Sequence, residues 1–384
     1  MTHANAPVRI RGMGLSCALG EGVAKCAAGL EAGIVETIPL ALDGLAEPLQ
    51  LRYYRIPDAA PLFEPGRFDA LMLRAVREAL DGAELSRAEL EKLPLFLGSS
   101  CFSVGKSEAR YAEELARGAP GATALPLVGF QHPAQAIQDE LGIRGETCAF
   151  NTACTASANA LMIASRMIRL GIHRHALVVG VELANRTTLA GFGGLQLLAE
   201  SVQPFDRRRG GIVLGEGVGA VVLSRDPSPR GVALAGAACN GDAYSVTAAN
   251  PDGSTIAAVQ MSVLRQAGVE PSRVRGIKTH GTASPLNDTG EAAGIRRVFE
   301  RPPPICALKP LIGHTLGACG VNEFVLMACA LERGFFPGTR GFEEQDPELG
   351  LWPERENRDA PRGDYLLNYF GFGGNNTSLL VQRT

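Results

Sequence analysis

Three residues of this chain can support thiol chemistry: one cysteine, Cys154, and two histidines, His280 and His314. Cys154 stands where an extended segment leads into a proline-free run of small and straight-chain apolar residues that stops at Gly171, which predicts a buried helix. A sulfur at that point faces unpaired backbone N–H groups and the positive end of the helix dipole, and both favour the thiolate. The pattern indicates a nucleophile, although an arbitrary cysteine is more often a small apolar core residue.

The two histidines supply what such a nucleophile needs. His280 closes a predicted strand and enters a loop, and His314 lies in a second loop just before another apolar helix. Neutral imidazoles beside a thiol can donate hydrogen bonds to a developing oxyanion or enolate, or move a proton. Either histidine alone would more often be structural, but an internal repeat places the two loops side by side. We assign no role to the other four histidines, and no cluster has metal-ligand spacing.

An internal repeat organises the elements that position these residues. Each copy has a strand, an amphipathic helix, a buried strand, a buried helix and a final strand, over residues 8–14, 67–80, 93–101, 155–171 and 176–182, and again over residues 232–236, 254–267, 276–280, 321–331 and 365–369. Alternating strands and helices predict an α/β fold. We expect two similar halves, 1–230 with the cysteine and 231–384 with the histidines, to form one compact unit around two central helices. Strand ends from both halves then converge on one site.

Three connecting segments need separate interpretation. Residues 39–65 are rich in proline and are predicted to be irregular. The glycines of 210–219 resemble a phosphate loop, but the apolar strand 220–223 follows them instead of a helix, so a turn between strands fits better. The glycine-dense stretch 371–376 is either a simple hairpin turn or a place where a backbone N–H approaches a ligand closely, as an oxyanion hole requires.

Composition narrows the classes of protein. The chain has 384 residues, 46% hydrophobic and 20% charged, with a net charge of −3, so it can bury a large core and has no bulk positive charge for nucleic acid. Nine cysteines without a CxxC pair, and no evident signal peptide, predict a cytoplasmic protein. No apolar run approaches the roughly 18 residues that span a bilayer. We therefore expect neither a nucleic-acid partner nor a membrane span.

The chain resembles the β-ketoacyl-acyl-carrier-protein synthases, condensing enzymes of the thiolase superfamily, over nearly its whole length. The order and local motifs that carry this resemblance belong to six residues: Cys154, His280, Lys309, His314, Glu323 and Phe372. The resemblance implies a thiolase-like, duplicated five-layered α/β/α/β/α core with pseudo-twofold symmetry. It also implies a homodimer, or a heterodimer with a related ketosynthase-like subunit.

The resemblance assigns catalytic roles to five of these residues. Cys154 would accept an acyl chain from the phosphopantetheine thioester of an acyl carrier protein. His280 and His314 would support decarboxylation of a malonyl thioester. Lys309 and Glu323 would form a supporting pair that orients the histidine loop. The implied product is a β-ketoacyl carrier protein, made in fatty-acid synthesis or in a specialised polyketide pathway such as that of an aryl polyene.

Substrate contacts follow from the same resemblance. The backbone N–H groups of Cys154 and Phe372 would form the oxyanion hole, with Phe372 also bordering the substrate. Thr282 and Ser284 would hydrogen-bond the pantetheine arm, and Phe192 would line the acyl end of the pocket. No metal and no tightly bound cofactor is implied, because the substrates arrive on the carrier's own phosphopantetheine.

A carrier protein in this setting is strongly acidic, whereas this chain is itself net negative. We therefore expect a local basic patch to dock the carrier, with Arg67 and Arg74 on the first amphipathic helix and some of residues 207–209 as the candidates.

Two alternatives stay open. A non-catalytic partner that sets the chain length made by another ketosynthase would usually lack the nucleophile, whereas Cys154 is present here. A Cys/His hydrolase would need water in the site and one orienting base, and nothing in the sequence selects it over a site with paired histidines.

Overall fold

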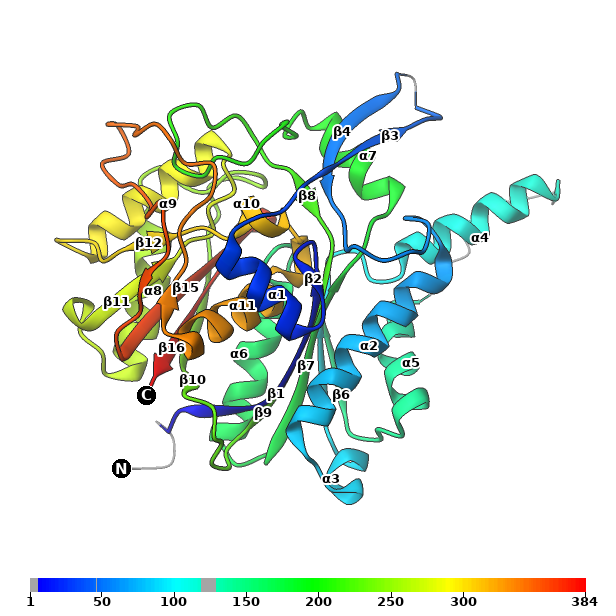
Figure 1. The fold of residues 1–384 in the computed structure, drawn as a ribbon, viewed down its shortest axis with the longest axis horizontal. Coiled ribbons are helices and arrows are strands. Elements are labelled where there is room, and N and C mark those ends of the chain that lie inside the picture. The colour runs from blue at the N-terminus through cyan, green and yellow to red at the C-terminus, as the bar shows by residue number, and fades with distance from the viewer. Residues whose placement is uncertain (1–5, 46, 119–128) are drawn as a thin grey trace.

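The computed structural model describes residues 6–45, 47–118 and 129–384. In this part of the chain, eleven strands form one mixed sheet (Figure 1). In spatial order they are β12 (Ile305–Cys306), β11 (Val274–Lys278), β15 (Gly363–Gly371), β16 (Asn375–Arg383), β10 (Val232–Gly241), β1 (Val8–Cys17), β9 (Gly217–Ser224), β7 (His175–Glu182), β5 (Leu95–Gly98) and β6 (Thr147–Phe150), with β2 (Gly20–Glu21) paired to β1.

The strands of the two repeats follow each other in mirrored order on the two sides of a central junction. The halves join where β1 and β10 pair antiparallel, with Val8 opposite Leu234. Moving outward from this junction, β9, β7, β5 and β6 on one side correspond to β16, β15, β11 and β12 on the other. The repeated elements therefore occupy equivalent places on the two sides of the junction.

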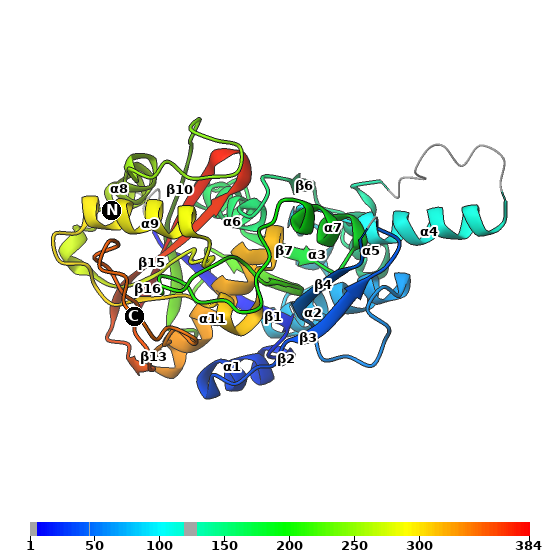
Figure 2. The same cartoon turned by 90° about the horizontal axis from the view of Figure 1, so that it is seen from above.

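Helices lie between and outside the two halves of the sheet (Figures 1 and 2). Those of four or more residues are α1 (Val23–Ala32), α2 (Pro65–Ala83), α3 (Arg87–Glu91), α4 (Val104–Ala116), α5 (His132–Leu141), α6 (Ala156–Arg169), α7 (Arg186–Gly194), α8 (Ser254–Ala267), α9 (Pro285–Val298), α10 (Lys309–Ile312) and α11 (Cys319–Arg333). Helices α6 and α11 are central, α2 and α5 cover the outer face of the first half, and α8 and α9 cover that of the second. This arrangement gives the five layers that the resemblance implies.

Three clusters of buried apolar side chains lie between these layers and hold them together. On strand β5, Phe96 points into the core around α6 and α11, whereas its neighbour Leu97 points into the core under α2. On β15, Leu367 and Leu366 make the same division between the central core and the core under α8. Because successive side chains of a strand point to opposite faces, a strand buried on both faces is a continuous apolar run.

Close packing of α6 on α11 brings the two halves of the site together. A Cβ atom at Gly320 of α11 would lie 2.0 Å from the backbone nitrogen of Ala158 on α6, so only glycine permits this contact. Cys154 lies just before α6, and His314 lies just before α11. The approach of the helices therefore fixes the cysteine turn against the histidine loop.

The interpretation of residues 39–65 as irregular was wrong for part of the segment. Strands β3 (Ile38–Leu42) and β4 (Leu49–Tyr54) form an antiparallel pair, and β4 also pairs with the short strand β8 (Leu214–Gly215). Pro39 lies on β3, the outer strand of this small sheet, where a missing N–H does not interrupt an internal ladder. A high proline content in this segment therefore did not exclude strands.

Helix α4 and strand β6 lie at the margins of the described structure. Helix α4 extends away from the body of the protein (Figures 1 and 2). Strand β6 is the last strand of the first half, with β5 as its neighbour on one side. Among the described residues, no helix is long and apolar enough to cross a membrane.

Candidate active site

Cys154 lies in a tight turn between β6 and α6. Ala153, just before it, has a φ of 50°, a left-handed conformation that is uncommon for a non-glycine residue and marks a constrained turn. Cys154 is 5% exposed and lines a pocket. Gly371 closes the turn from the other half, because a Cβ atom there would lie 3.3 Å from the backbone nitrogen of Cys154. The cysteine therefore faces the pocket from a rigid, crowded backbone.

The surroundings of Cys154 hold its thiol protonated. Burial raises the pKa of Cys154 to about 11, and the more distant Glu182 carboxylate adds to this. The Lys309 ammonium and the backbone N–H groups of Phe372 and Cys154 lower the pKa, but not enough to offset burial. The backbone N–H groups at the start of the helix therefore favour the thiolate, as expected, but burial outweighs them and keeps the resting thiol protonated.

The raised pKa of Cys154 predicts how the rate of its alkylation depends on pH. Alkylation of Cys154 by iodoacetamide should accelerate about tenfold for each pH unit between about pH 7 and 10, because only the thiolate reacts. Peptide mapping after timed alkylation measures this rate. A plateau below about pH 9 would show instead that the thiol ionises near the value of a free cysteine.

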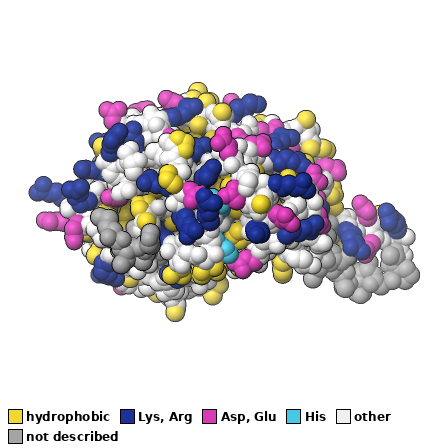
Figure 3. Space-filling model, turned by 90° about the horizontal axis from the view of Figure 1, so that it is seen from below, with side chains coloured by type: hydrophobic (Ala, Val, Ile, Leu, Met, Phe, Trp, Pro, Cys, Tyr) yellow, Lys and Arg dark blue, Asp and Glu magenta, His cyan; other side chains and the backbone are white. Residues whose placement is uncertain are grey.

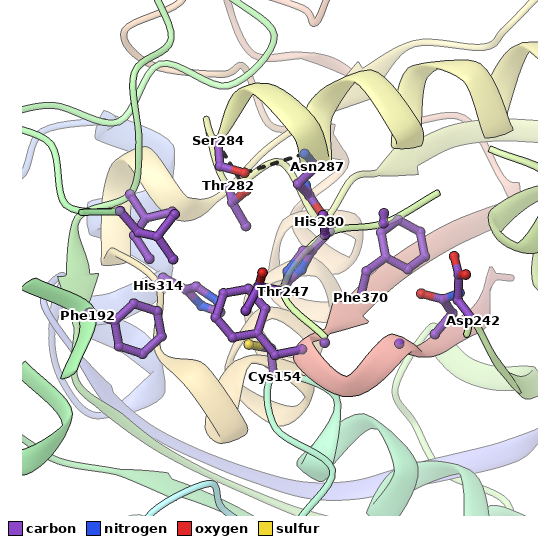
Figure 4. A pocket seen from close by; sticks show the side chains of 18 residues that line it. Cys154, Phe192, Asp242, Thr247, His280, Thr282, Ser284, Asn287, His314 and Phe370 are labelled. Carbon is purple, nitrogen blue, oxygen red and sulfur yellow. Dashed lines mark hydrogen bonds between the residues drawn. The ribbon is translucent and has the colours of Figure 1, made fainter. Parts of the chain in front are cut away.

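His280 and His314 face Cys154 across the pocket (Figure 4). Their ring centroids are 5.4 Å apart and the rings are almost perpendicular. Burial, followed by the Lys309 ammonium, holds the pKa of each histidine well below its usual value. Both rings are therefore neutral at physiological pH.

The contacts of each ring define its tautomer. The Lys309 Nζ lies 3.3 Å from His280 Nδ1, and an ammonium group can only donate, so this Nδ1 accepts. The backbone N–H of Leu316 donates to His314 Nδ1 at 3.2 Å. In both rings the proton therefore belongs on Nε2. The site holds two neutral N–H donors beside one thiol.

The predicted pair of Lys309 and Glu323 is present and buried. The Lys309 Nζ donates to Glu323 Oε1 at 2.9 Å and to the backbone oxygen of His280 at 2.6 Å. Lys278, which sequence reasoning missed, is fully buried and donates to Glu323 Oε2, so two ammonium groups share one carboxylate. Burial opposes ionisation of Glu323, but Lys278 and Lys309 together hold its pKa below the usual value.

Glu291 was also missed. Its carboxylate, on α9, accepts hydrogen bonds from the backbone N–H groups of His280 at 2.8 Å and Gly281 at 2.9 Å. Burial raises the pKa of Glu291 to about 7. The only sequence signal was its position eleven residues after His280, in a helix that packs back on the histidine loop.

A polar network fixes the cysteine turn to the loop that carries Phe372. The Asn159 amide on α6 donates to Thr152 Oγ1 at 2.8 Å and to Asn375 Oδ1 at 2.9 Å. The hydroxyl of Thr377 donates to Asn159 Oδ1 at 2.7 Å. Because these groups satisfy one another in the interior, they position the Phe372 N–H relative to Cys154.

The predicted substrate residues line the same pocket. Thr282 and Ser284 lie at one side, next to the start of α9 (Figure 4). The ring of Phe192, on α7, stacks on that of Phe372 with centroids 5.9 Å apart. The pocket thus has a polar wall and an aromatic wall. Among the described residues, no group of three or more histidines, cysteines or acids could hold a metal ion.

Arg67 is not the exposed docking residue that the sequence suggested. Its side chain is 2% exposed, and its guanidinium is held by Glu216, with Nη1 to Oε2 at 2.8 Å, and by Asp58 at 2.8 Å. Arg74 is exposed on the same helix and pairs with Glu21. The amphipathic pattern could not reveal Glu216, which is 149 residues away in sequence.

The basic run at 207–209 is also paired. Each of its arginines meets an acid of a facing loop: Arg207 with Glu344, Arg208 with Glu343 and Arg209 with Asp346. On the face shown in Figure 3, basic and acidic side chains are mixed, in keeping with the low net charge of the chain.

Removing Arg67 should destabilise the fold. Arg67→Ala leaves the buried Glu216 carboxylate without its cation, which typically costs about 3–5 kcal/mol. The matched control is Arg74→Ala, which breaks an exposed pair worth about 0–1 kcal/mol. Urea unfolding measures both, and equal midpoints for the two variants would contradict the structural role of Arg67.

The fold and this site define the protein's class: a duplicated thiolase-like condensing-enzyme core, with a cysteine before one central helix and two histidines supplied by the other half. The model for the β-ketoacyl synthase N-terminal domain matches residues 64–228, and that for the C-terminal domain matches residues 232–343. The chain belongs to the β-ketoacyl synthase family.

Known proteins show the same relationship. The 3-oxoacyl-[acyl-carrier-protein] synthase 2 of Vibrio cholerae is 31% identical over 262 residues, and the match spans 63% of each chain. A ketosynthase in complex with its chain length factor from Xenorhabdus doucetiae superposes with a TM-score of 0.87, at 26% identity and 98% coverage of both chains. The ishigamide ketosynthase/chain length factor gives 0.86, at 28% identity, covering 99% of this chain and 100% of that one.

Proposed function

We propose that the protein catalyses a decarboxylating Claisen condensation, joining an acyl chain on Cys154 to a malonyl unit delivered by an acyl carrier protein. One observation carries the proposal. A nucleophilic thiol and two neutral imidazoles, each with its proton on Nε2, line a single pocket. A hydrolase needs a histidine that accepts a proton, and here both Nδ1 atoms are occupied by donors.

Acyl transfer comes first. The Cys154 sulfur attacks the carbonyl of the carrier's thioester, the new S–C bond forms, and the bond to the pantetheine sulfur breaks. Neither imidazole can take the thiol proton on Nε2, which is already protonated, so the proton passes to the departing pantetheine thiolate. The N–H groups of Cys154 and Phe372, which lie against the Cys154 sulfur, would hold the oxyanion.

Decarboxylation follows on the malonyl thioester. The bond to the carboxylate breaks, CO2 leaves, and the electron pair moves onto the thioester as an enolate. The Nε2–H groups of His280 and His314 donate to the enolate oxygen and stabilise it as its charge develops. The Lys309 ammonium behind His280 supports the negative charge and keeps the tautomer fixed.

Condensation completes the cycle. The enolate carbon attacks the acyl carbon on Cys154, and the resulting oxyanion again lies between the Cys154 and Phe372 N–H groups. The C–S bond breaks, and the β-ketoacyl chain leaves on the carrier. The cysteine thiolate then takes a proton from solvent, which its pKa of about 11 favours. Thr282 and Ser284 would hold the pantetheine arm, and Phe192 the acyl chain.

The proposal includes a partner subunit. Strand β6 has an outer edge that no described strand covers, and such edges are usually paired or protected. Two of the solved structures similar to this chain pair a ketosynthase with a chain length factor. These observations support a homodimer, or a heterodimer with a related ketosynthase-like subunit. Arg74 remains an exposed candidate for docking the carrier.

The pathway is fatty-acid elongation or a polyketide synthesis such as that of an aryl polyene. The Vibrio cholerae relative supports the first, and the two ketosynthase and chain length factor structures support the second. Mass spectrometry of the products formed from saturated and polyunsaturated acyl carriers distinguishes them.

We expect acylation at Cys154 and not at Cys319, which occupies the equivalent helix start in the second half. Cys319 is fully buried, and its sulfur lies 3.2 Å from His314 Nδ1, on the side of the ring away from the pocket donor. Peptide mapping after incubation with an acyl carrier protein tests this assignment. A stable acyl group on Cys319 would overturn it. No acyl group anywhere would favour the alternative, a non-catalytic chain-length-determining partner.

A further inference from the structure

Glu182, the last residue of β7, has no role in the mechanism described so far. Glu182 is only 3% exposed, and its buried carboxylate accepts several hydrogen bonds. Oε2 accepts from Ser100 N at 2.8 Å, Ser100 Oγ at 2.6 Å and Gly317 N at 2.9 Å, and Oε1 accepts from Cys101 N at 3.1 Å. Burial raises the pKa of Glu182, while these donors lower it.

The donors come from two segments of different halves. Ser100 lies in the turn between β5 and α4, and Gly317 lies in the short 3-10 helix Leu316–Ala318 that follows His314. The two backbones touch, because a Cβ atom at Gly317 would lie 2.2 Å from the nitrogen of Ser100. Glu182 therefore ties the turn after His314 to the wall of the first half.

That turn also carries the donor that sets the His314 tautomer. Leu316 has a φ of 45°, a left-handed conformation that is strained in a non-glycine residue and persists only where its surroundings hold it. Its N–H is the donor to His314 Nδ1. The next peptide along the chain presents the Gly317 N–H that Glu182 accepts.

We propose that Glu182 is a positioning residue for decarboxylation. By holding the Gly317 N–H it holds the strained Leu316 turn, which in turn keeps His314 with its proton on Nε2, aimed at the pocket. This inference rests on the proposed function and adds a residue to it. Its charge alone would act the other way at the nucleophile, because Glu182 raises the pKa of Cys154.

Two conservative variants distinguish the effect of the length of the Glu182 side chain from the effect of its negative charge. Glu182→Asp keeps the carboxylate but withdraws its oxygens from Gly317. Glu182→Gln keeps the length, and its amide oxygen in the place of Oε2 can still accept from Ser100 and Gly317. Only the hydrogen bond from the Cys101 N–H to Oε1 is lost, because an amide nitrogen there cannot accept. The measurements are CO2 release from malonyl carrier protein, acylation of Cys154, and the ¹⁵N shifts of the His314 ring nitrogens.

Glu182→Asp should slow CO2 release about tenfold or more, short of the about 10²–10³ for losing a donor outright. Its Cys154 should still be acylated, and the His314 spectrum should show loss of the single Nε2–H tautomer. Glu182→Gln should stay within about threefold of the native enzyme in CO2 release and should alkylate faster at Cys154.

Three outcomes would overturn the inference: Glu182→Asp releasing CO2 at the native rate, Glu182→Gln losing as much as Glu182→Asp, or both half-reactions falling together with the His314 spectrum unchanged. The last would mark a purely structural residue. A native protein that releases no CO2 would refute the proposed function instead, and the ring-nitrogen spectra would still test the effect of Glu182 on His314.

Discussion

Replacing His314 with alanine should leave Cys154 able to accept an acyl chain while CO2 release from malonyl carrier protein falls by about 10²–10³, the usual effect of losing one oxyanion-type donor. In the proposed mechanism, acyl transfer uses the N–H groups of Cys154 and Phe372, which lie in the cysteine turn and the facing loop. Decarboxylation builds charge where the Nε2–H of His314 points. Intact-protein mass spectrometry measures the first reaction, and labelled CO2 measures the second.

The control for this variant is His173→Ala, because His173 lies outside the pocket and pairs with Glu146 near the surface. It should keep both reactions. If His314→Ala loses acylation as completely as decarboxylation, the division of labour between the two halves of the site is wrong.

The variant Cys154→Gln should have the opposite effect: it should lose acylation and keep decarboxylation. Without the thiol there is no acyl-enzyme, so acylation and condensation should be abolished. Decarboxylation should persist, because both histidines and the Lys309–Glu323 pair remain, and the glutamine amide occupies the place of an acylated sulfur.

The matched control is Cys239→Ala, which removes an exposed thiol that is not among the residues lining the pocket. It should condense normally. A Cys154→Gln variant that also fails to release CO2 would show that decarboxylation depends on the acyl-enzyme itself and not on the histidine donors alone.

Local patterns predicted the elements that are buried and regular. Helix α8 spans residues 254–267 as expected, and the repeat correctly ordered the strands and helices around α6 and α11. The strands missed at β3 and β4 are both partly exposed, and β3 contains Pro39, so neither an apolar run nor a clean alternation identified them.

The parts of the site that the sequence could not supply depend on distant partners. Lys278 reads as a polar residue at a strand end, and only the folded chain shows that it shares Glu323 with Lys309. Arg67 reads as the polar face of an amphipathic helix until Glu216 is placed against it. Each pairing joins residues that are far apart in the sequence.

The pKa of Cys154 illustrates the same limit. The sequence shows the start of a helix, which favours a thiolate, but the amount of burial is a property of the whole fold. Burial proved the larger effect and raised the pKa to about 11. The local electrostatic argument therefore gave the right direction for the N–H groups but could not weigh them against burial.

The most direct test of the central claim is mass spectrometry of the carrier protein after the chain is incubated with an acyl carrier and a malonyl carrier. The mechanism predicts a β-ketoacyl chain, longer than the starting acyl chain by one acetyl unit, formed with one CO2 per product and absent with Cys154→Gln. An unextended acyl chain, with Cys154 free and no CO2 released by the native protein and its partner subunit, would contradict it.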